Sequence, residues 1–261
     1  MRKQIEVLER CHKYNLMVNA EKSIIAGSTK IEFVGYKIKQ NSIKPMQKKH
    51  NVISDFKIPE SRTDLRCFVS LASGLEKFSP NLAKTMEPLR DLLKTWNEFK
   101  WYADHMMAFN KVKKLLTSTN NLAMYNPKKQ TCLDTDASRT GLGFVLSQKQ
   151  GIDKVGNKIW KWIQAGSRFL TNAETRYAMV ELEALAVYYA IKKCQLFLAG
   201  TDFEVLVDHK PLLPMFNQQL LPHIENPRVQ NYQTKLANYR FKLVWKKGST
   251  HCVPDNNILI L

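Results

Sequence analysis

The stretch Thr131-Cys-Leu-Asp-Thr-Asp136 is an apolar run that closes on an acidic residue, and it has the form of a buried β-strand over 130–136. Similar strand-like runs follow it at 141–148, 158–168, 203–207 and 240–246. A helix is predicted over 175–198, ending at Gly200. A helix between the third and fourth strands indicates an antiparallel meander joined to parallel elements. The sequence therefore predicts an α/β fold built on a mixed five-stranded sheet.

Four acidic residues occupy places that such a fold brings together. Asp136 and Asp208 each end a strand-like run, and Glu183 lies inside the long helix. Asp255 follows the last strand after a short loop. Carboxylates crowd together only where cations neutralise them, so the arrangement predicts a site for divalent metal. Two Mg²⁺ ions about 4 Å apart serve in-line attack on a phosphodiester, and we therefore expect a nuclease site.

Spacing leaves two of these positions ambiguous. Asp134 and Asp136 are two residues apart on a strand, so both side chains point to the same face. Glu181 is placed much like Glu183 in the helix, where apolar neighbours one turn away make a charge costly. The spacing therefore leaves two candidate pairs, Asp134 or Asp136 and Glu181 or Glu183, and does not indicate which member of each pair belongs to the site.

The chain is strongly basic, with a formal net charge of +17 over 261 residues. There are 22 basic and 12 acidic residues before Pro127, and 18 basic and 11 acidic residues from there on, so both parts are positive. An extended positive surface suits a polyphosphate backbone, although a generally basic and well-solvated protein has the same composition. We therefore expect a nucleic-acid partner.

The cysteines and the apolar runs indicate the compartment. Five cysteines are scattered without zinc-ligand spacing, so free thiols in a reducing compartment are expected. No run of about 18 apolar residues occurs, and the amino terminus has no apolar signal core. These features predict neither a membrane span nor secretion, and they favour an intracellular location in the cytoplasm or nucleus.

The part before residue 126 has a different pattern. Alternating residues at 31–38 predict a β-hairpin or strand, and three amphipathic helices are predicted between 46 and 120. Ser61 and Asp64 have the form of a capping box at the start of the first helix. A small helical subdomain is therefore expected ahead of the sheet.

The string Leu133-Asp-Thr-Asp-Ala-Ser-Arg-Thr-Gly-Leu-Gly-Phe-Val-Leu146 closely resembles the opening of the RNase H domain in the pol polyproteins of gypsy-type LTR retrotransposons. Further strings match the family in order: Ala165-Gly-Ser-Arg-Phe-Leu170, Glu174-Thr-Arg-Tyr-Ala178, Glu181-Leu-Glu-Ala-Leu-Ala-Val187, Phe197-Leu-Ala-Gly200 and Val207-Asp-His-Lys-Pro-Leu212. Upstream, Phe33-Val-Gly-Tyr36 is similar to the hairpin that holds the primer end, and Pro88-Leu-Arg-Asp-Leu-Leu93 is similar to the thumb. The resemblance covers nearly the whole chain.

The resemblance implies three parts in an α/β, RNase H-like protein. Residues 1–45 are expected to be a remnant of a reverse transcriptase palm with a primer-grip-like hairpin. Residues 46–125 are expected to be a helical thumb and bridge. Residues 126–261 are expected to be an RNase H-like domain that lacks a full C-terminal helix.

The resemblance also implies which acids form the site. The family pattern selects Asp136, Glu183, Asp208 and Asp255, and it leaves Asp134 and Glu181 outside. In such enzymes these four residues hold two Mg²⁺ ions, for which Mn²⁺ substitutes, and the substrate is the RNA strand of an RNA–DNA hybrid.

Two departures from the family define the alternatives. No Asp-Asp pair of a polymerase centre occurs, so we expect no polymerisation by this chain alone. A reverse transcriptase polymerase domain or a second copy of the chain is a candidate partner. Asn256-Asn-Ile-Leu-Ile-Leu261 stands where the family continues into a helix, so the rival hypothesis is a catalytically inactive relic that binds nucleic acid. A third hypothesis, an integrase or transposase, is disfavoured because Glu183 lies on the first long helix.

Overall fold

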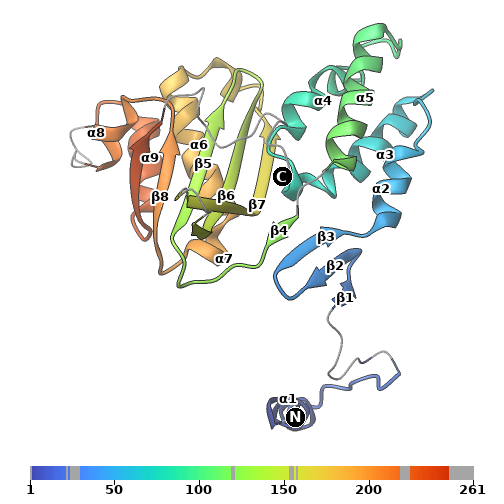
Figure 1. Cartoon of the computed structure of the whole chain (residues 1–261). Helices are drawn as coiled ribbons and strands as arrows, with labels where there is room; N and C mark the ends of the chain where they lie inside the picture. Colours follow the sequence, from blue (N-terminus) through green and yellow to red (C-terminus); the bar gives the residue numbers. More distant parts are fainter. Residues whose placement is uncertain are drawn as a thin grey trace.

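The computed structural model describes residues 2–21, 23, 30–118, 121–152, 156, 158–217 and 224–246. Within these residues the chain forms two sheets and a set of helices between and beside them (Figure 1). Helix α1 (Arg2–Lys13) lies apart from both sheets in Figure 1, and its apolar residues Ile5, Val7 and Leu8 are exposed.

The smaller sheet contains the hairpin that the sequence predicts. Its strands are β1 (Lys30–Phe33), β2 (Tyr36–Lys39), β3 (Ser42–Pro45) and β4 (Leu122–Ala123), in that order and all antiparallel. Val34 and Gly35 join β1 to β2 with φ angles of +47° and +75°. Two positive φ angles are typical of the tight turn that matches the twist of a hairpin, and glycine adopts such an angle without strain.

The helical unit, as we call residues 47–117, contains α2 to α5. These are α2 (Gln47–Ser54), α3 (Arg62–Ser73), the 3-10 turn η1 (Glu76–Phe78), α4 (Leu82–Asp91) and α5 (Ala103–Thr117). The capping box is confirmed, because Asp64 N and Ser61 N each bond to the other residue's side chain. The prediction of three helices missed α2, which is short and polar and buries only Ile53.

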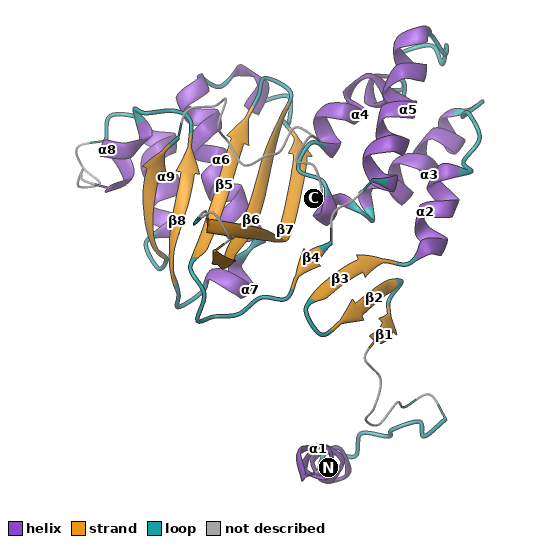
Figure 2. Ribbon diagram, in the orientation of Figure 1, coloured by secondary structure: helices purple, strands orange, loops and turns teal. Residues whose placement is uncertain are grey.

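The sheet unit, as we call residues 131–245, contains the larger sheet. Its strands are β5 (Thr131–Ala137), β6 (Gly141–Ile152), β7 (Lys158–Phe169), β8 (Asp202–Val207) and β9 (Arg240–Trp245). The strand order is β7-β6-β5-β8-β9, with β5 to β7 antiparallel and β5, β8 and β9 parallel. The predicted mixed five-stranded sheet is therefore confirmed (Figure 2).

The predicted long helix over 175–198 is wrong in its extent. It divides into η2 (Glu174–Arg176), α6 (Met179–Lys193) and α7 (Gln195–Leu198). Ala178 is extended, and the Glu181 side chain accepts a hydrogen bond from its N–H at 2.9 Å, so α6 starts there. Two further helices, α8 (Leu212–Asn217) and α9 (Pro227–Leu236), complete the unit.

The core of the sheet unit lies between α6 and the sheet. Helix α6 packs on β5 and β6, and α9 packs on α6. Leu133, Val187 and Val205 are fully buried in this core. Burial on this scale drives folding through the removal of apolar surface from water, and it fixes α6 across the strands that carry the acidic residues.

The two units are joined along β7, which is an edge strand. Ser167 N donates to Glu76 Oε1 at 2.9 Å, and Ala83 N donates to Ser167 Oγ at 3.0 Å. A Cβ at Gly143 would lie 2.9 Å from Pro80 O, so only glycine permits this approach. The helical unit thus covers part of an edge that would otherwise offer unpaired backbone groups.

Candidate active site

Three of the predicted acids converge at one end of the larger sheet. Asp136 lies in β5, and Asp208 follows β8 directly. These strands are parallel neighbours, with Asp134 in register with Leu206, so residues two positions further along both strands lie side by side. Glu183 reaches the same point from α6. One carboxylate oxygen from each of the three residues lies within 4.8 Å of the others.

The three carboxylates differ in their exposure. Asp136 and Asp208 are exposed, whereas Glu183 is 1% exposed. Within the described part of the chain, the Oε2 atom of Glu183 is buried and has no hydrogen-bond partner. The cluster is therefore buried at Glu183 and open to solvent at Asp136 and Asp208.

The electrostatics of the cluster favour neutralisation. Burial, followed by the charges of Asp208 and Asp136, raises the pKa of Glu183 to about 9. A buried carboxylate beside two others is stable only when it holds a proton or meets a cation. Oxygen ligands at this spacing are those that Mg²⁺ and Mn²⁺ prefer, so these residues fit a divalent metal site.

The two residues of each ambiguous pair separate in the structure. Asp134 is 2% exposed on β5 and is not one of the three clustered acids. Burial opposes the ionisation of Glu181, but hydrogen bonds from Asn226 Nδ2 and Arg228 Nη1 outweigh it and lower its pKa. Glu181 therefore fastens α6 to α9. Asp255 lies outside the described residues.

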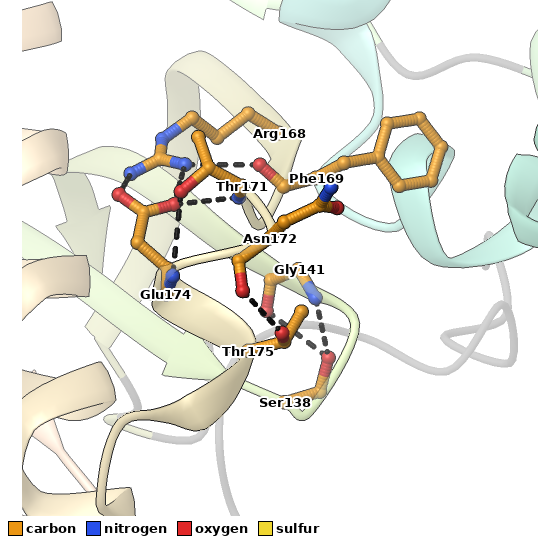
Figure 3. Close-up of polar contacts among 8 residues, drawn as sticks. All are labelled: Ser138, Gly141, Arg168, Phe169, Thr171, Asn172, Glu174 and Thr175. Atoms are coloured by element: carbon orange, nitrogen blue, oxygen red, sulfur yellow. Dashed lines mark hydrogen bonds and ion pairs between the residues drawn. The ribbon is translucent and has the colours of Figure 1, made fainter.

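A tight turn begins at Ser138, immediately after the end of β5. The Ser138 hydroxyl accepts from Gly141 N at 3.0 Å and donates to Gly141 O at 3.0 Å (Figure 3). Ser138 N also donates to Gly141 O at 2.8 Å. The turn returns the chain into β6, and it thereby fixes the end of β5 where Asp136 lies.

An ion pair connects the end of β7 to the turn that precedes α6. Arg168 Nη1 and Nη2 donate to Glu174 Oε2 and Oε1 at 2.7 and 2.8 Å, and Thr171 N donates to Glu174 Oε2 at 2.8 Å (Figure 3). The Arg168 guanidinium lowers the pKa of Glu174. The pair ties the end of β7 to η2, just ahead of the helix that carries Glu183. Both residues belong to strings that resemble the family, but nothing in their spacing indicates this contact.

Residues 126–239 match the RNase H-like domain found in reverse transcriptase. These residues therefore form an RNase H-like domain. The same domain contains Asp136, Glu183 and Asp208, so the clustered acids lie within the RNase H-like part of the chain.

The whole chain also has relatives among retrotransposon proteins. It is 29% identical over 252 residues to the transposon Tf2-3 and Tf2-4 polyproteins of Schizosaccharomyces pombe. The match covers 96% of this chain and 18% of each polyprotein. The resemblance to retrotransposon pol polyproteins is therefore confirmed, and the chain spans about a fifth of the length of these relatives.

Solved structures show the same fold. The foamy viral protease-reverse transcriptase in complex with an RNA/DNA hybrid matches all of this chain with a TM-score of 0.71 and 19% identity, over 36% of its own length. The same viral protein in complex with dsDNA matches 94% of this chain with a TM-score of 0.68 and 21% identity, over 51% of its own length. In the described part of this chain, every helix is too short or too polar to cross a lipid bilayer.

Proposed function

We propose that this chain is a metal-dependent endonuclease that cleaves the RNA strand of RNA–DNA hybrids, as a part of a retrotransposon reverse transcriptase. One observation carries the proposal: Glu183 is buried with an unpartnered oxygen between two exposed aspartates, in an RNase H-like domain. An acid in that position is costly to the fold unless a cation meets it.

Asp136, Glu183 and Asp208 would hold the divalent metal, with Asp255 as a fourth ligand and two Mg²⁺ or Mn²⁺ ions in the complete site. The metal supplies Lewis acidity toward the phosphoryl group and makes water a nucleophile near neutral pH. Glu183 would give up its proton to hold the metal, because the ion would replace that proton as the neutralising charge. Asp136 and Asp208 stand on the solvent side, where a phosphodiester backbone can approach.

The proposed substrate suits the charge of the chain. A net charge of +17 favours a polyanion, and the viral relatives were solved with RNA/DNA hybrid and with dsDNA. The 2′-hydroxyl distinguishes the RNA strand, and the shape of a hybrid is read through backbone contacts. The similarity to the viral reverse transcriptase over the whole chain supports a palm remnant at 1–45, a thumb and bridge at 46–125, and an RNase H-like domain at 126–261.

The proposal is tested by cleavage of an end-labelled RNA–DNA hybrid, first with Mg²⁺ and then with Mn²⁺. We expect the RNA strand alone to be cut, and Asp136→Asn to stop the cutting because it removes a ligand charge. Asp134→Asn is the matched control two residues away on the same strand, and it is expected to cut. Melting curves for both variants show that they are folded. A folded wild-type chain that binds the hybrid but cuts it with neither metal would instead support the inactive relic.

A further inference from the structure

Trp245 ends strand β9 and contacts the segment that carries Asp208. Its indole Nε1 donates a hydrogen bond to the backbone carbonyl of Asp208 at 3.0 Å. Trp245 is in register with Val207 across the parallel pair of β8 and β9, and the next residue, Lys246, donates its backbone N–H to Val207 O at 3.0 Å. Two successive carbonyls at the end of β8 are therefore held from the end of β9.

The hydrogen bond between Trp245 and Asp208 lies just beyond the end of strand β8. Strand β8 ends at Val207, so the sheet ladder no longer fixes the backbone at Asp208. The peptide that follows a strand end is free to rotate unless another group holds its carbonyl, and its rotation redirects the side chain. The indole supplies a bond at this place, immediately beside the carboxylate that completes the cluster with Asp136 and Glu183.

A second contact holds the segment further along. Asn217, at the end of α8, donates its Nδ2 to Leu243 O at 2.8 Å and accepts from Leu243 N at 2.9 Å. The segment from Asp208 to Asn217 is thus attached to β9 at both ends. Because Leu243 is fully buried, β9 is a firm support for these contacts.

The indole is not held in place by burial alone. Trp245 is 38% exposed, so water could satisfy its N–H, yet the N–H meets the Asp208 carbonyl. The Lys210 ammonium lies 4.1 Å from the centre of the indole ring, in the arrangement of a cation–π contact. Lys210 follows Asp208 by two residues, so the ring contacts the same short segment twice.

We propose that Trp245 is a positioning residue, whose indole N–H fixes the peptide of Asp208 and thereby aims its carboxylate into the metal cluster. This inference rests on the proposed function, because it concerns the same metal site. Trp245 acts through Asp208 and makes no contact of its own with the metal or the substrate in the proposed site.

The test measures Mn²⁺ binding by calorimetry on the full chain without nucleic acid. Trp245→Phe keeps a ring but removes the N–H, and the loss of one hydrogen bond is expected to weaken Mn²⁺ binding about 3- to 10-fold. Trp96→Phe is the matched control, since Trp96 is 76% exposed in the helical unit, and it is expected to bind Mn²⁺ as the wild type does. In cleavage assays Trp245→Phe should lower kcat and leave the KM for the hybrid unchanged.

A second measurement uses only the wild-type chain, so it does not depend on whether a variant folds. Amide and indole hydrogen exchange, followed by NMR on the wild-type chain, should show that the Trp245 indole N–H exchanges about tenfold or more slowly than that of Trp96, because a hydrogen-bonded N–H must open before it exchanges. Equal exchange of the two indoles would overturn the inference.

The outcomes separate this inference from the proposed function. A wild-type chain that binds no Mn²⁺ and cuts no hybrid contradicts the proposed function and removes the basis of the inference. A wild-type chain that binds and cuts, beside a Trp245→Phe variant with the same Mn²⁺ affinity, contradicts the inference alone. A raised KM with unchanged Mn²⁺ affinity also overturns it, because Trp245 would then contact the nucleic acid instead.

Discussion

The helical unit and the sheet unit bury different chemistry. Among the described residues of the helical unit, Ser79 is the one buried polar residue, and the rest of its core is apolar. Among its described residues, the sheet unit buries three carboxylic acids, namely Asp134, Glu181 and Glu183. An apolar core needs only to exclude water, whereas a buried acid needs a partner. The buried residues of the helical unit therefore stabilise the fold, whereas the buried acids of the sheet unit include Glu183, whose Oε2 atom has no partner among the described residues.

The two buried acids of α6 differ in whether the protein itself satisfies their charge. Glu181 has three donors, which are Ala178 N, Asn226 Nδ2 and Arg228 Nη1, and its charge is satisfied within the protein. Glu183, two residues later, has an oxygen without a partner in the described part of the chain and faces two further carboxylates. Glu181 is therefore satisfied within the fold, whereas Glu183 is the acid whose charge a bound cation would neutralise.

The largest effect on stability is expected in the helical unit. Phe68 is fully buried, and its ring centre lies 4.6 Å from that of Phe109 and 5.3 Å from that of Phe56. Phe68→Ala should lower the free energy of unfolding of this unit by about 3–5 kcal/mol, because it leaves a cavity. Urea titration measures the loss, with the exposed Leu71→Ala in the same helix as a control that stays within about 0.5 kcal/mol. Equal losses in both variants would show that the apolar core is not what holds this unit.

The next effect concerns the two ends of β8. Asp208→Asn removes a carboxylate of the cluster and should reduce cleavage of the hybrid more than about 100-fold, beyond what outer-shell changes at metal sites usually cost. Asp202→Asn makes the same change at the start of β8, where Asp202 pairs with Arg240 on the surface, and it should leave the rate unchanged. Rates at saturating hybrid for the two variants decide the matter, and full activity in Asp208→Asn would remove that residue from the site.

Replacing Glu183 should raise the free energy of unfolding, by less than replacing Phe68 lowers it. Its folded pKa of about 9 lies above its ordinary value, so the stability linked to its protonated form is complete below about pH 4.5 and is lost as the pH rises toward about 9. In the presence of chelator near pH 8, Glu183→Gln should therefore raise the free energy of unfolding by on the order of 1–3 kcal/mol.

Glu181→Gln is the control for that measurement. The pKa of Glu181 is lowered by its hydrogen bonds, so the loss of its charge should destabilise the fold where Glu183→Gln stabilises it. Urea titrations of both variants with and without Mn²⁺ give the comparison, and Mn²⁺ should stabilise the wild type but not Glu183→Gln. Destabilisation by both substitutions in chelator would show that Glu183 has its partner within the protein.

The smallest effect is expected at the Arg168–Glu174 pair. Both side chains are partly buried, and Glu174→Gln should cost about 1–2 kcal/mol near pH 7. Since the pKa of Glu174 is lowered, this contribution is present above the ordinary pKa of a glutamate and is lost as the pH falls through the folded value. The melting temperatures of variant and wild type should therefore differ at neutral pH and converge at acidic pH. Glu98→Gln, at the exposed pair with Lys100, should change little at either pH.

Much of the sheet unit could be predicted because its signals are local. The strands β5, β8 and β9 are short runs of six or seven residues, and β5 ends within one residue of its expected limit at Asp136. The convergence of Asp136, Glu183 and Asp208 followed from general rules about where strands end in α/β folds. The choice of Asp136 over Asp134, and of Glu183 over Glu181, needed the family resemblance at the sequence level, because the spacing is equal for both.

What could not be predicted depends on partners far away in the sequence. The start of α6 at Ala178 is fixed by Glu181, which is held by residues 45 and 47 positions later. Trp245 bonds to a carbonyl 37 residues earlier, and nothing in the strand pattern of β9 marks that contact. Helix α2 was missed because it has little apolar periodicity and depends on packing against α3 and α5. Long-range contacts of this kind leave no periodic signal in the chain.

The most direct test of the central claim is the pH dependence of Mn²⁺ binding, measured by calorimetry on the wild-type chain. If the buried Glu183 exchanges its proton for metal, the affinity should rise by up to about tenfold per pH unit between about pH 6 and pH 8.5, and protons should be released on binding. Asp202→Asn should follow the wild-type curve. An affinity that does not change with pH over this range, or an absence of binding, would contradict the claim that the cluster of Asp136, Glu183 and Asp208 is a metal site.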